Sequence, residues 1–237
     1  MILSIHQPSY FPWLGLLDKI RRSDVLMIMD EVQLSDSAFQ HRNLFLTRDG
    51  QQKFLTIPFV KKGYLQVPFR EIRIAAPDWQ LKHLNFIKHN YGRHPYAQEI
   101  MPYLEEYFSG DYERLVDAVV ASMRLTFDLF QIDAQVVFQS AADYDRSLRR
   151  GELILALVRA SGARCYLSGQ GARAYLDESA FCGDLRLIYN EFHHPAYPQQ
   201  GTNEFHSGLS GLDALFNLGV HRSRSLLRSR GERLITT

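Results

Sequence analysis

The stretch MILSIHQPSYFPWLGLLDKIRRSDVLMIMD, residues 1–30, contains the pattern that decides the fold. Residues 2–5 are a short apolar run rich in branched side chains, and residues 24–30 are a second apolar run that ends on an acidic residue. Between them, apolar side chains from Trp13 to Arg21 repeat at the intervals of a helix packed on one face. Two buried strands joined by a helix are expected to lie parallel.

The same alternation returns in the second half of the chain. The segments AQVVFQS (134–140), RCYLSG (164–169) and LRLIYNEF (185–192) predict further buried strands, and ELILALVRA (152–160) predicts a helix between them. The fold class is therefore predicted to be α/β: a Rossmann-like, mostly parallel sheet with a β-hairpin insertion and a helical annex.

The insertion and the annex lie between the two halves of the sheet. The segments 39–47, 51–60 and 69–75 predict strands, with the turn RDG at 48–50, and Trp79 to Phe130 predict helices. We expect a single domain over 1–237, with an α/β core at about 1–35 and 132–220, the hairpin at about 36–76 and the annex at about 77–131. Residues 221–234 predict a basic, partly solvated tail.

Composition narrows the class of partner. A formal net charge of +1 offers no electrostatic field for nucleic acid, so a general nucleic-acid binder is not expected. Cys165 and Cys182 have neither a disulfide framework nor zinc-site spacing. No apolar run is long enough to cross a bilayer, and the start lacks a signal peptide's features. A cytoplasmic protein without membrane insertion is expected.

The candidate site follows from the ends of the predicted strands. Ligands of open parallel sheets bind beyond the carboxyl ends of the strands. That edge should carry His6 and Gln7, Asp30, and the turn formed by Ser168 and Gly169. The loop after His6 leads into a helix start, whose free N–H groups and dipole favour an anionic group. The alternatives are a tight turn with a capped histidine, and an aspartate that caps a turn.

Three other segments contain candidate residues. Arg42 and Asn43, on the hairpin, can overhang the strand ends as a lid, or can belong to a polar strand face exposed to solvent. The Gly-rich turn at 166–177 lacks the lysine of a P-loop. The loop FHHPAYPQQG (192–201) groups His193, Tyr197 and Gln199 without diagnostic metal-ligand spacing, so no metal or cofactor is predicted.

Taken together, these blocks resemble a known family. HQPSYFPWLGLLDKIRRSDVLMIMDEVQ (6–33), RN (42–43), YLSGQGARAYL (166–176), HHPAYPQ (193–199) and LSGLDALFNLG (209–219) are similar to successive blocks of the WbqC-like family. The segment SAFQH (37–41) departs from the family pattern, which weakens the case for His41 as a site residue. The resemblance implies a bacterial cytosolic protein of cell-surface glycan (O-antigen, lipopolysaccharide) biosynthesis, which attaches acyl or aminoacyl groups to amino sugars.

The leading hypothesis is a transferase that joins an acyl or aminoacyl group to an amino sugar carried on a nucleotide or lipid. Its partners would be a sugar nucleotide or acyl donor, with an acyl carrier protein as a further candidate. Such a reaction needs a base, donors for the oxyanion and a clamp for phosphates. We expect the catalytic residues to be His6, Asp30 and His193. The expected substrate-binding residues are Gln7, Tyr10, Arg42, Asn43, Ser168, Gly169, Tyr197 and Gln199.

Two other functions remain open. The first is a non-catalytic module that binds a sugar nucleotide or an acyl carrier. The second is an ATP-dependent nucleotidyltransferase-like enzyme, because the order of strand, His-x-Pro loop, helix and strand is similar to the start of the HxGH folds. The second histidine of that signature is missing, since Leu14 and Gly15 stand near its place.

Overall fold

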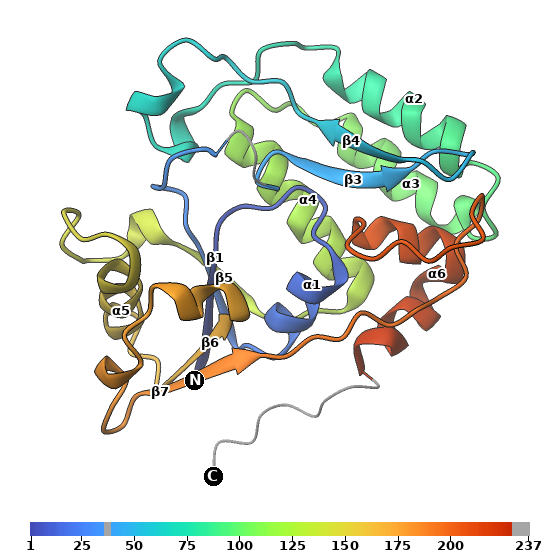
Figure 1. The fold of residues 1–237 in the computed structure, drawn as a ribbon. Helices are drawn as coiled ribbons and strands as arrows, with labels where there is room; N and C mark the ends of the chain where they lie inside the picture. Colours follow the sequence, from blue (N-terminus) through green and yellow to red (C-terminus); the bar gives the residue numbers. More distant parts are fainter. Residues whose placement is uncertain (36–38, 229–237) are drawn as a thin grey trace.

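The structure, a computed structural model, describes residues 1–35 and 39–228 (Figure 1). Its main element is a sheet of five parallel strands in the order β5-β2-β1-β6-β7. The strands are β1 (Ile2–His6), β2 (Val25–Ile28), β5 (Gln135–Phe138), β6 (Cys165–Gly169) and β7 (Arg186–Asn190). The predicted α/β, Rossmann-like class with a mostly parallel sheet is confirmed.

The strand order fixes where a ligand is expected. The first three strands of the sheet along the chain, β1, β2 and β5, follow one another toward one edge, whereas β6 and β7 continue from β1 toward the other edge. The order therefore reverses between β1 and β6. This is the arrangement of Rossmann halves, in which ligands bind at the carboxyl ends beside the reversal.

Helices cover both faces of this sheet. Leu3 and Ile5 point toward α5 (Arg150–Ala160), with which they share a buried apolar cluster. Leu26 and Ile28 point the other way, into the larger core that contains α1 (Leu14–Arg21) and α4 (Leu115–Phe130). Figure 1 shows α5 on one side of the strands and α1 on the other. This alternation explains why the strands read as continuous apolar runs.

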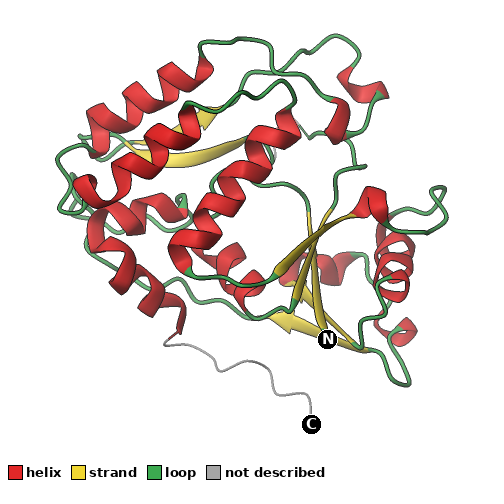
Figure 2. Ribbon diagram, turned by 180° about the vertical axis from the view of Figure 1, so that it is seen from behind, coloured by secondary structure: helices red, strands yellow, loops and turns green. Residues whose placement is uncertain are grey.

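A second layer of structure lies beside the sheet. The antiparallel hairpin of β3 (Arg42–Leu46) and β4 (Gln52–Thr56) packs with α2 (Trp79–Tyr91) and α3 (Ala97–Phe108), and Figure 2 shows these elements on the same side of the molecule. The last helix is α6 (Gly211–Arg228), which is interrupted at Gly219. Short 3-10 helices cover Tyr64–Gln66, Phe69–Glu71, Gln139–Ala141, Gln170–Ala174 and Glu178–Ala180.

Two predicted segments differ in the structure. Residues 69–75 do not form a third strand, because the N–H groups of Phe69 and Arg70 donate to Val32 and Asp30 in the loop after β2, and Ile74 forms only an isolated bridge with Phe59. Residues 221–228 of the predicted tail form the end of α6, where His221, Arg222 and Ser225 are exposed and Leu227 is buried in the core. Residues 229–234 of that predicted tail lie outside the described part of the chain.

The first helix begins one residue later than its apolar pattern suggests. Trp13 is the extended residue before α1 and is partly buried, whereas Leu17 is fully buried. The indole of Trp13 folds back over Gly15, where an added Cβ would lie 2.2 Å from the ring. It also stacks on His194, with ring centroids 6.5 Å apart. Trp13 therefore fastens the loop after β7 to the start of α1.

The loop between β1 and α1 joins the sheet to the annex. Tyr10 and Phe11 are fully buried, and Phe11 has a φ of 40°, in the left-handed region. The side-chain amide of Asn43 on β3 donates to the backbone carbonyls of both residues, at 3.0 and 2.7 Å. The Tyr10 hydroxyl lies 2.9 Å from His83 Nδ1 on α2. The loop is thus buried, and side chains of β3 and α2 hold it in place. We call it the buried plug.

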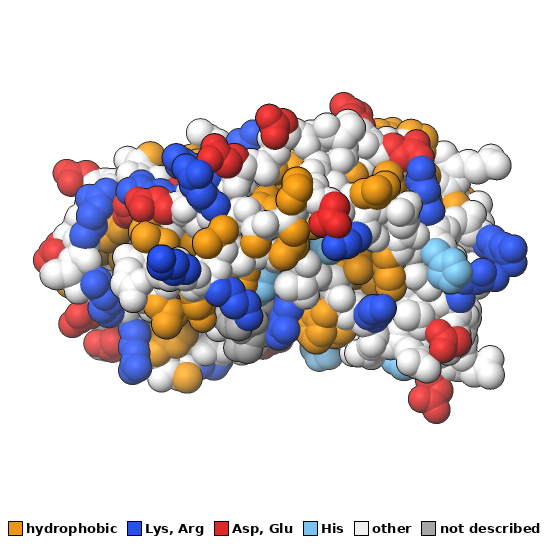
Figure 3. Space-filling view, turned by 90° about the horizontal axis from the view of Figure 1, so that it is seen from above, with side chains coloured by type: hydrophobic (Ala, Val, Ile, Leu, Met, Phe, Trp, Pro, Cys, Tyr) orange, Lys and Arg blue, Asp and Glu red, His pale blue; other side chains and the backbone are white. Residues whose placement is uncertain are grey.

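Charged side chains are mixed over the face of the molecule seen in Figure 3, where lysine and arginine alternate with aspartate and glutamate. No helix within residues 1–35 and 39–228 combines the length and apolarity that a bilayer crossing requires.

We predict that Asn43→Ala lowers the free energy of unfolding by about 2–5 kcal/mol, because it leaves two buried carbonyls without their donor. Asn85→Ala, on the exposed face of α2, is the matched control and should change it by less than about 0.5 kcal/mol. Urea denaturation of the three proteins measures both values. Equal midpoints for Asn43→Ala and the wild type would show that the clamp does not stabilise the fold.

Candidate functional site

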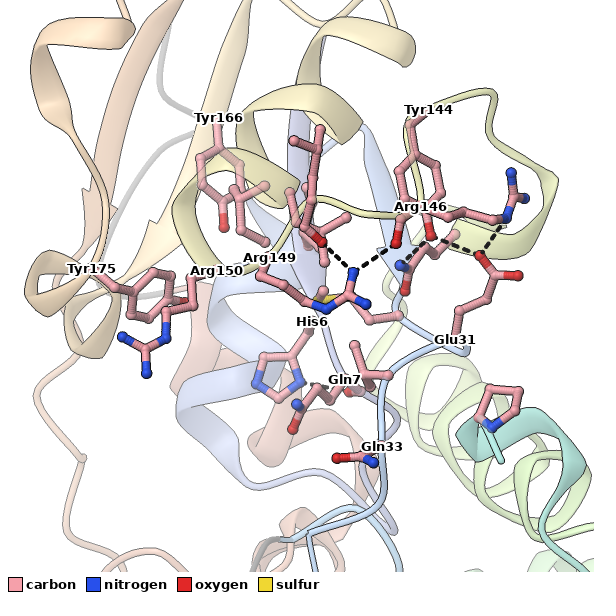
Figure 4. A pocket seen from close by; sticks show the side chains of 18 of the residues that line it. His6, Gln7, Glu31, Gln33, Tyr144, Arg146, Arg149, Arg150, Tyr166 and Tyr175 are labelled. Atoms are coloured by element: carbon pink, nitrogen blue, oxygen red, sulfur yellow. Dashed lines mark hydrogen bonds and ion pairs between the residues drawn. The ribbon is translucent and has the colours of Figure 1, made fainter. Parts of the chain in front are cut away.

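A cavity of about 1120 Å³ opens at the carboxyl ends of β1, β2 and β5, on the face of the sheet that α5 covers (Figure 4). We call it the carboxyl-edge cavity. It lies beside the reversal of strand order, where the topology places ligands. Its lining residues are Ile5, His6, Gln7, Met29, Glu31, Val32, Gln33, Pro68, Gln139, Tyr144, Arg146, Leu148, Arg149, Arg150, Leu153, Ile154, Tyr166, Ala174 and Tyr175.

His6 is the last residue of β1 and its imidazole has a defined tautomer. Nδ1 lies 2.7 Å from the carbonyl oxygen of Gln7, which can only accept, so Nδ1 carries the proton. Nε2 is then left with a lone pair, and Figure 4 shows it turned away from Gln7. Burial, with the charge of Lys19 nearby, lowers the pKa of His6 to about 3. The ring is therefore neutral at pH 7 and can accept a proton or a hydrogen bond at Nε2.

Lys19 also favours the neutral form of His6. Its ammonium group is buried and donates to the carbonyl of Ile5 at 3.1 Å. Burial lowers the pKa of Lys19 to about 8, which leaves it mostly charged at pH 7. A cation next to His6 disfavours a second positive charge on the imidazole.

Three arginines gather where α5 begins. Arg149 precedes the helix and donates to the carbonyls of Arg146 and Leu148 at 2.6 and 2.7 Å, which orders the loop. Arg150 has a φ of 50°, a strained value for a residue other than glycine. Within residues 1–35 and 39–228, its guanidinium has no hydrogen-bond or ion-pair partner. An arginine held in this way is available to an anion.

Glu31 balances part of this charge. Its carboxylate pairs with Arg70 at 3.3 Å and with Arg146 at 3.4 Å. It also accepts a hydrogen bond from the Tyr144 hydroxyl at 2.7 Å. Arg146 and Glu31 are thus neutralised by one another, whereas Arg149 and Arg150 face the cavity without a paired acid among the residues that line it. The cavity retains a positive end at the start of α5.

Several predicted site residues have structural partners instead. The carboxylate of Asp30 accepts from the backbone N–H and the hydroxyl of Ser140, at 2.9 and 2.6 Å, so it caps the turn after β5. Ser168 is fully buried and its hydroxyl lies 3.4 Å from the Tyr166 hydroxyl. Neither residue lines the carboxyl-edge cavity. Gly169 is next to open space, because an added Cβ would meet no atom within 4 Å.

The hairpin and loop candidates lie elsewhere in the fold. Asn43 and Tyr10 belong to the buried plug described above, and Arg42 stacks its guanidinium 4.2 Å from the ring centroid of Phe54. His193 is exposed on the segment after β7. The structure therefore does not bring the predicted residues together in one pocket. Of those residues, His6 and Gln7 line the cavity.

Tyr197 and Gln199 surround a buried carboxylate. Asp213, in the first turn of α6, accepts hydrogen bonds from Tyr197 at 2.8 Å, from Gln199 at 3.1 Å and from Tyr91 at 3.1 Å. Burial raises the pKa of Asp213, and these hydrogen bonds oppose the rise. The three donors replace the water that a buried carboxylate loses. This cluster fixes the 192–201 loop against the annex rather than forming a ligand site.

The part of the chain that the structure describes contains no group of three or more His, Cys, Asp or Glu side chains placed to hold a metal ion.

Comparison with known proteins places the chain in a family. A model of the WbqC-like protein family matches residues 7–225. The chain belongs to the WbqC-like protein family. A family relative, the uncharacterized protein Rv1507c of Mycobacterium tuberculosis, is 27% identical over 228 residues, which cover 92% of this chain and 94% of the relative. No solved structure matches the chain.

The sequence did not predict most of the residues that line the carboxyl-edge cavity. The segment DYDRSLRR (143–150) has the composition of a solvent-exposed connection, so its sequence does not mark Arg146, Arg149 and Arg150 as site residues. Gln139 and Tyr144 follow β5 and bear no motif. Their position along the chain could have located Gln139 and Tyr144, because the rule that ligands bind beyond the carboxyl ends of parallel strands applies to β5 as it does to β1.

We predict that His6 stays neutral between pH 8 and pH 5, with its proton on Nδ1. Because its pKa is lowered in the fold, the unfolded chain takes up a proton near pH 6.5 and the folded chain does not. His6 therefore contributes to a loss of stability as the pH falls below 6.5. Long-range ¹H–¹⁵N spectra of the imidazole test this, and a titration midpoint for His6 near 6.5 would contradict the described geometry.

Proposed function

We propose that this WbqC-like protein is a transferase of bacterial cell-surface glycan biosynthesis that attaches an acyl or aminoacyl group to an amino sugar carried on a nucleotide or lipid. The carboxyl-edge cavity would bind the sugar and its phosphates. The observation that carries the proposal is that Arg149 and Arg150, at the start of α5, line the same cavity as a neutral imidazole.

The arginines suit phosphate groups. A guanidinium donates two parallel hydrogen bonds to a phosphate, and it stays charged at every relevant pH. Arg149 is already ordered by two carbonyls of its own loop, and Arg150 has no partner in the described chain. Binding an anion would therefore require no protein ion pair of Arg150 to break.

The imidazole suits the proton transfer. Attack of the sugar amine on an acyl carbon forms the new C–N bond and leaves a positively charged nitrogen, whose proton must leave before the donor's leaving group departs. His6 is neutral and presents Nε2, so it can take this proton without first losing one. A phosphate bound at Arg149 and Arg150 would add negative charge to the cavity and raise the pKa of His6 toward neutrality.

A non-catalytic binding module is the second candidate. The low pKa of His6 favours it, because a general base works best with a pKa near the working pH. In this reading His6 is a hydrogen-bond acceptor for the ligand and no bond is made. Turnover separates the two functions, since a module binds a sugar nucleotide and leaves it unchanged.

We predict that Arg150→Gln weakens the binding of uridine diphosphate by about 10- to 100-fold, the usual loss for a charged hydrogen bond. Arg159→Gln is the matched control, because Arg159 is exposed at the opposite end of the same helix. Isothermal titration calorimetry measures both affinities. Equal affinities for the two variants would remove the anion site from the start of α5.

We predict that His6→Gln lowers the rate of acyl transfer by about 10²–10⁴ and leaves the affinity for the sugar nucleotide within a few-fold of wild type. The rate is followed by mass spectrometry of purified protein with amino-sugar nucleotides and acyl donors, and the affinity by calorimetry on the same preparation. Full turnover by the variant would exclude His6 as the base. A wild-type protein that binds but never turns over would favour the binding module.

A further inference from the structure

We propose that Gln139 is a ligand-binding residue of the carboxyl-edge cavity, and that its side-chain oxygen accepts a hydrogen bond from an N–H or O–H group of the bound sugar. This inference rests on the proposed function and adds a residue that selects the ligand. Gln139 would bind the part of the sugar that carries hydrogen-bond donors, whereas the arginines would bind the phosphates.

A chain of hydrogen bonds fixes the orientation of the Gln139 amide. Glu31, held by Arg70 and Arg146, can only accept, so the Tyr144 hydroxyl donates to it at 2.7 Å. The oxygen of Tyr144 then accepts from Gln139 Nε2, which is 2.7 Å away. The nitrogen of the amide is committed to this chain, and its oxygen is the atom left for a molecule in the cavity.

The oxygen of Gln139 is buried without a donor. The side chain is 2% exposed, and Oε1 has no hydrogen-bond partner among residues 1–35 and 39–228. Buried polar atoms in native proteins are almost always paired, so an unpaired acceptor requires an explanation. Gln139 lines the carboxyl-edge cavity, and a ligand that displaces the atoms covering Oε1 can supply the missing donor.

The polar atoms of the cavity define the class of ligand. Gln139 Oε1 and His6 Nε2 are both acceptors, whereas Arg149 and Arg150 are donors at the start of α5. A phosphate or carbonyl oxygen fits the arginines and is mismatched at Gln139. A molecule with an anionic end and an amino- or hydroxyl-bearing end satisfies both sets, as a phosphate-linked amino sugar does.

The test is a pair of probes observed at two places in the wild-type protein by NMR. Uridine diphosphate and uridine diphosphate glucosamine should both shift the backbone resonances of residues 149–151. The glucosamine conjugate alone should shift the side-chain amide of Gln139, whose signal is assigned by its loss in Gln139→Met. If the Gln139 amide does not move with the conjugate, the inference is overturned. If residues 149–151 do not move with either probe, the proposed anion site fails instead.

Variants give a second, independent measurement. Gln139→Met should weaken the binding of the conjugate by roughly 3- to 10-fold, the loss expected for one neutral hydrogen bond. It should leave the affinity for uridine diphosphate unchanged. Gln98→Met is the control, because Gln98 is exposed on α3 and does not line the cavity. An equal loss for both probes, or for both variants, overturns the inference. Should Gln139→Met not fold, the side-chain amide of Gln139 is assigned through its correlation with the sequentially assigned backbone of the wild type, and those spectra decide alone.

Discussion

The two hydrogen bonds from Asn43 to the carbonyls of Tyr10 and Phe11 are the constraint on which the rest of the structure depends. They hold a buried loop with Phe11 in a left-handed conformation, and they join the first strand of the sheet to the hairpin. The same loop leaves β1 at His6, so the clamp also sets where β1 ends. Without this clamp the loop would keep its contacts with the annex, such as Tyr10 with His83 and Phe11 with Ser122, and would lose its hydrogen bonds to the hairpin.

The position of the cavity follows from the sheet and its chemistry follows from α5. The reversal of strand order between β1 and β6 leaves a crevice at the carboxyl ends, and α5 begins beside it with Arg149 and Arg150. At the end of β1, burial and the charge of Lys19 keep His6 neutral. The result is a cavity with donors at the start of α5 and acceptors after β1 and β5, which is a selective arrangement for a molecule with unlike ends.

The sequence predicted the framework well and the site only in part. Apolar runs and helical spacing located β1, α1, β2, β6 and β7, because burial on both faces imposes those patterns. The strand-end rule found His6 and Gln7. A sequence does not show whether a polar side chain binds a ligand or a buried partner in the protein. Asn43 and Tyr197 were therefore predicted to bind substrate, whereas Asn43 bonds to the loop after β1 and Tyr197 bonds to Asp213. Residues 69–75 resemble a strand in their apolar pattern, but the N–H groups of Phe69 and Arg70 bond to the loop after β2, and Ile74 forms only an isolated bridge with Phe59.

The central claim is that the carboxyl-edge cavity binds a phosphate-linked amino sugar in one orientation. A crystal structure of the protein with uridine diphosphate glucosamine tests it most directly. The account predicts phosphate oxygens within hydrogen-bond distance of Arg149 and Arg150, and the sugar within reach of His6 Nε2 and Gln139 Oε1. A ligand bound outside this cavity, or bound with its phosphates at Gln139, would contradict it.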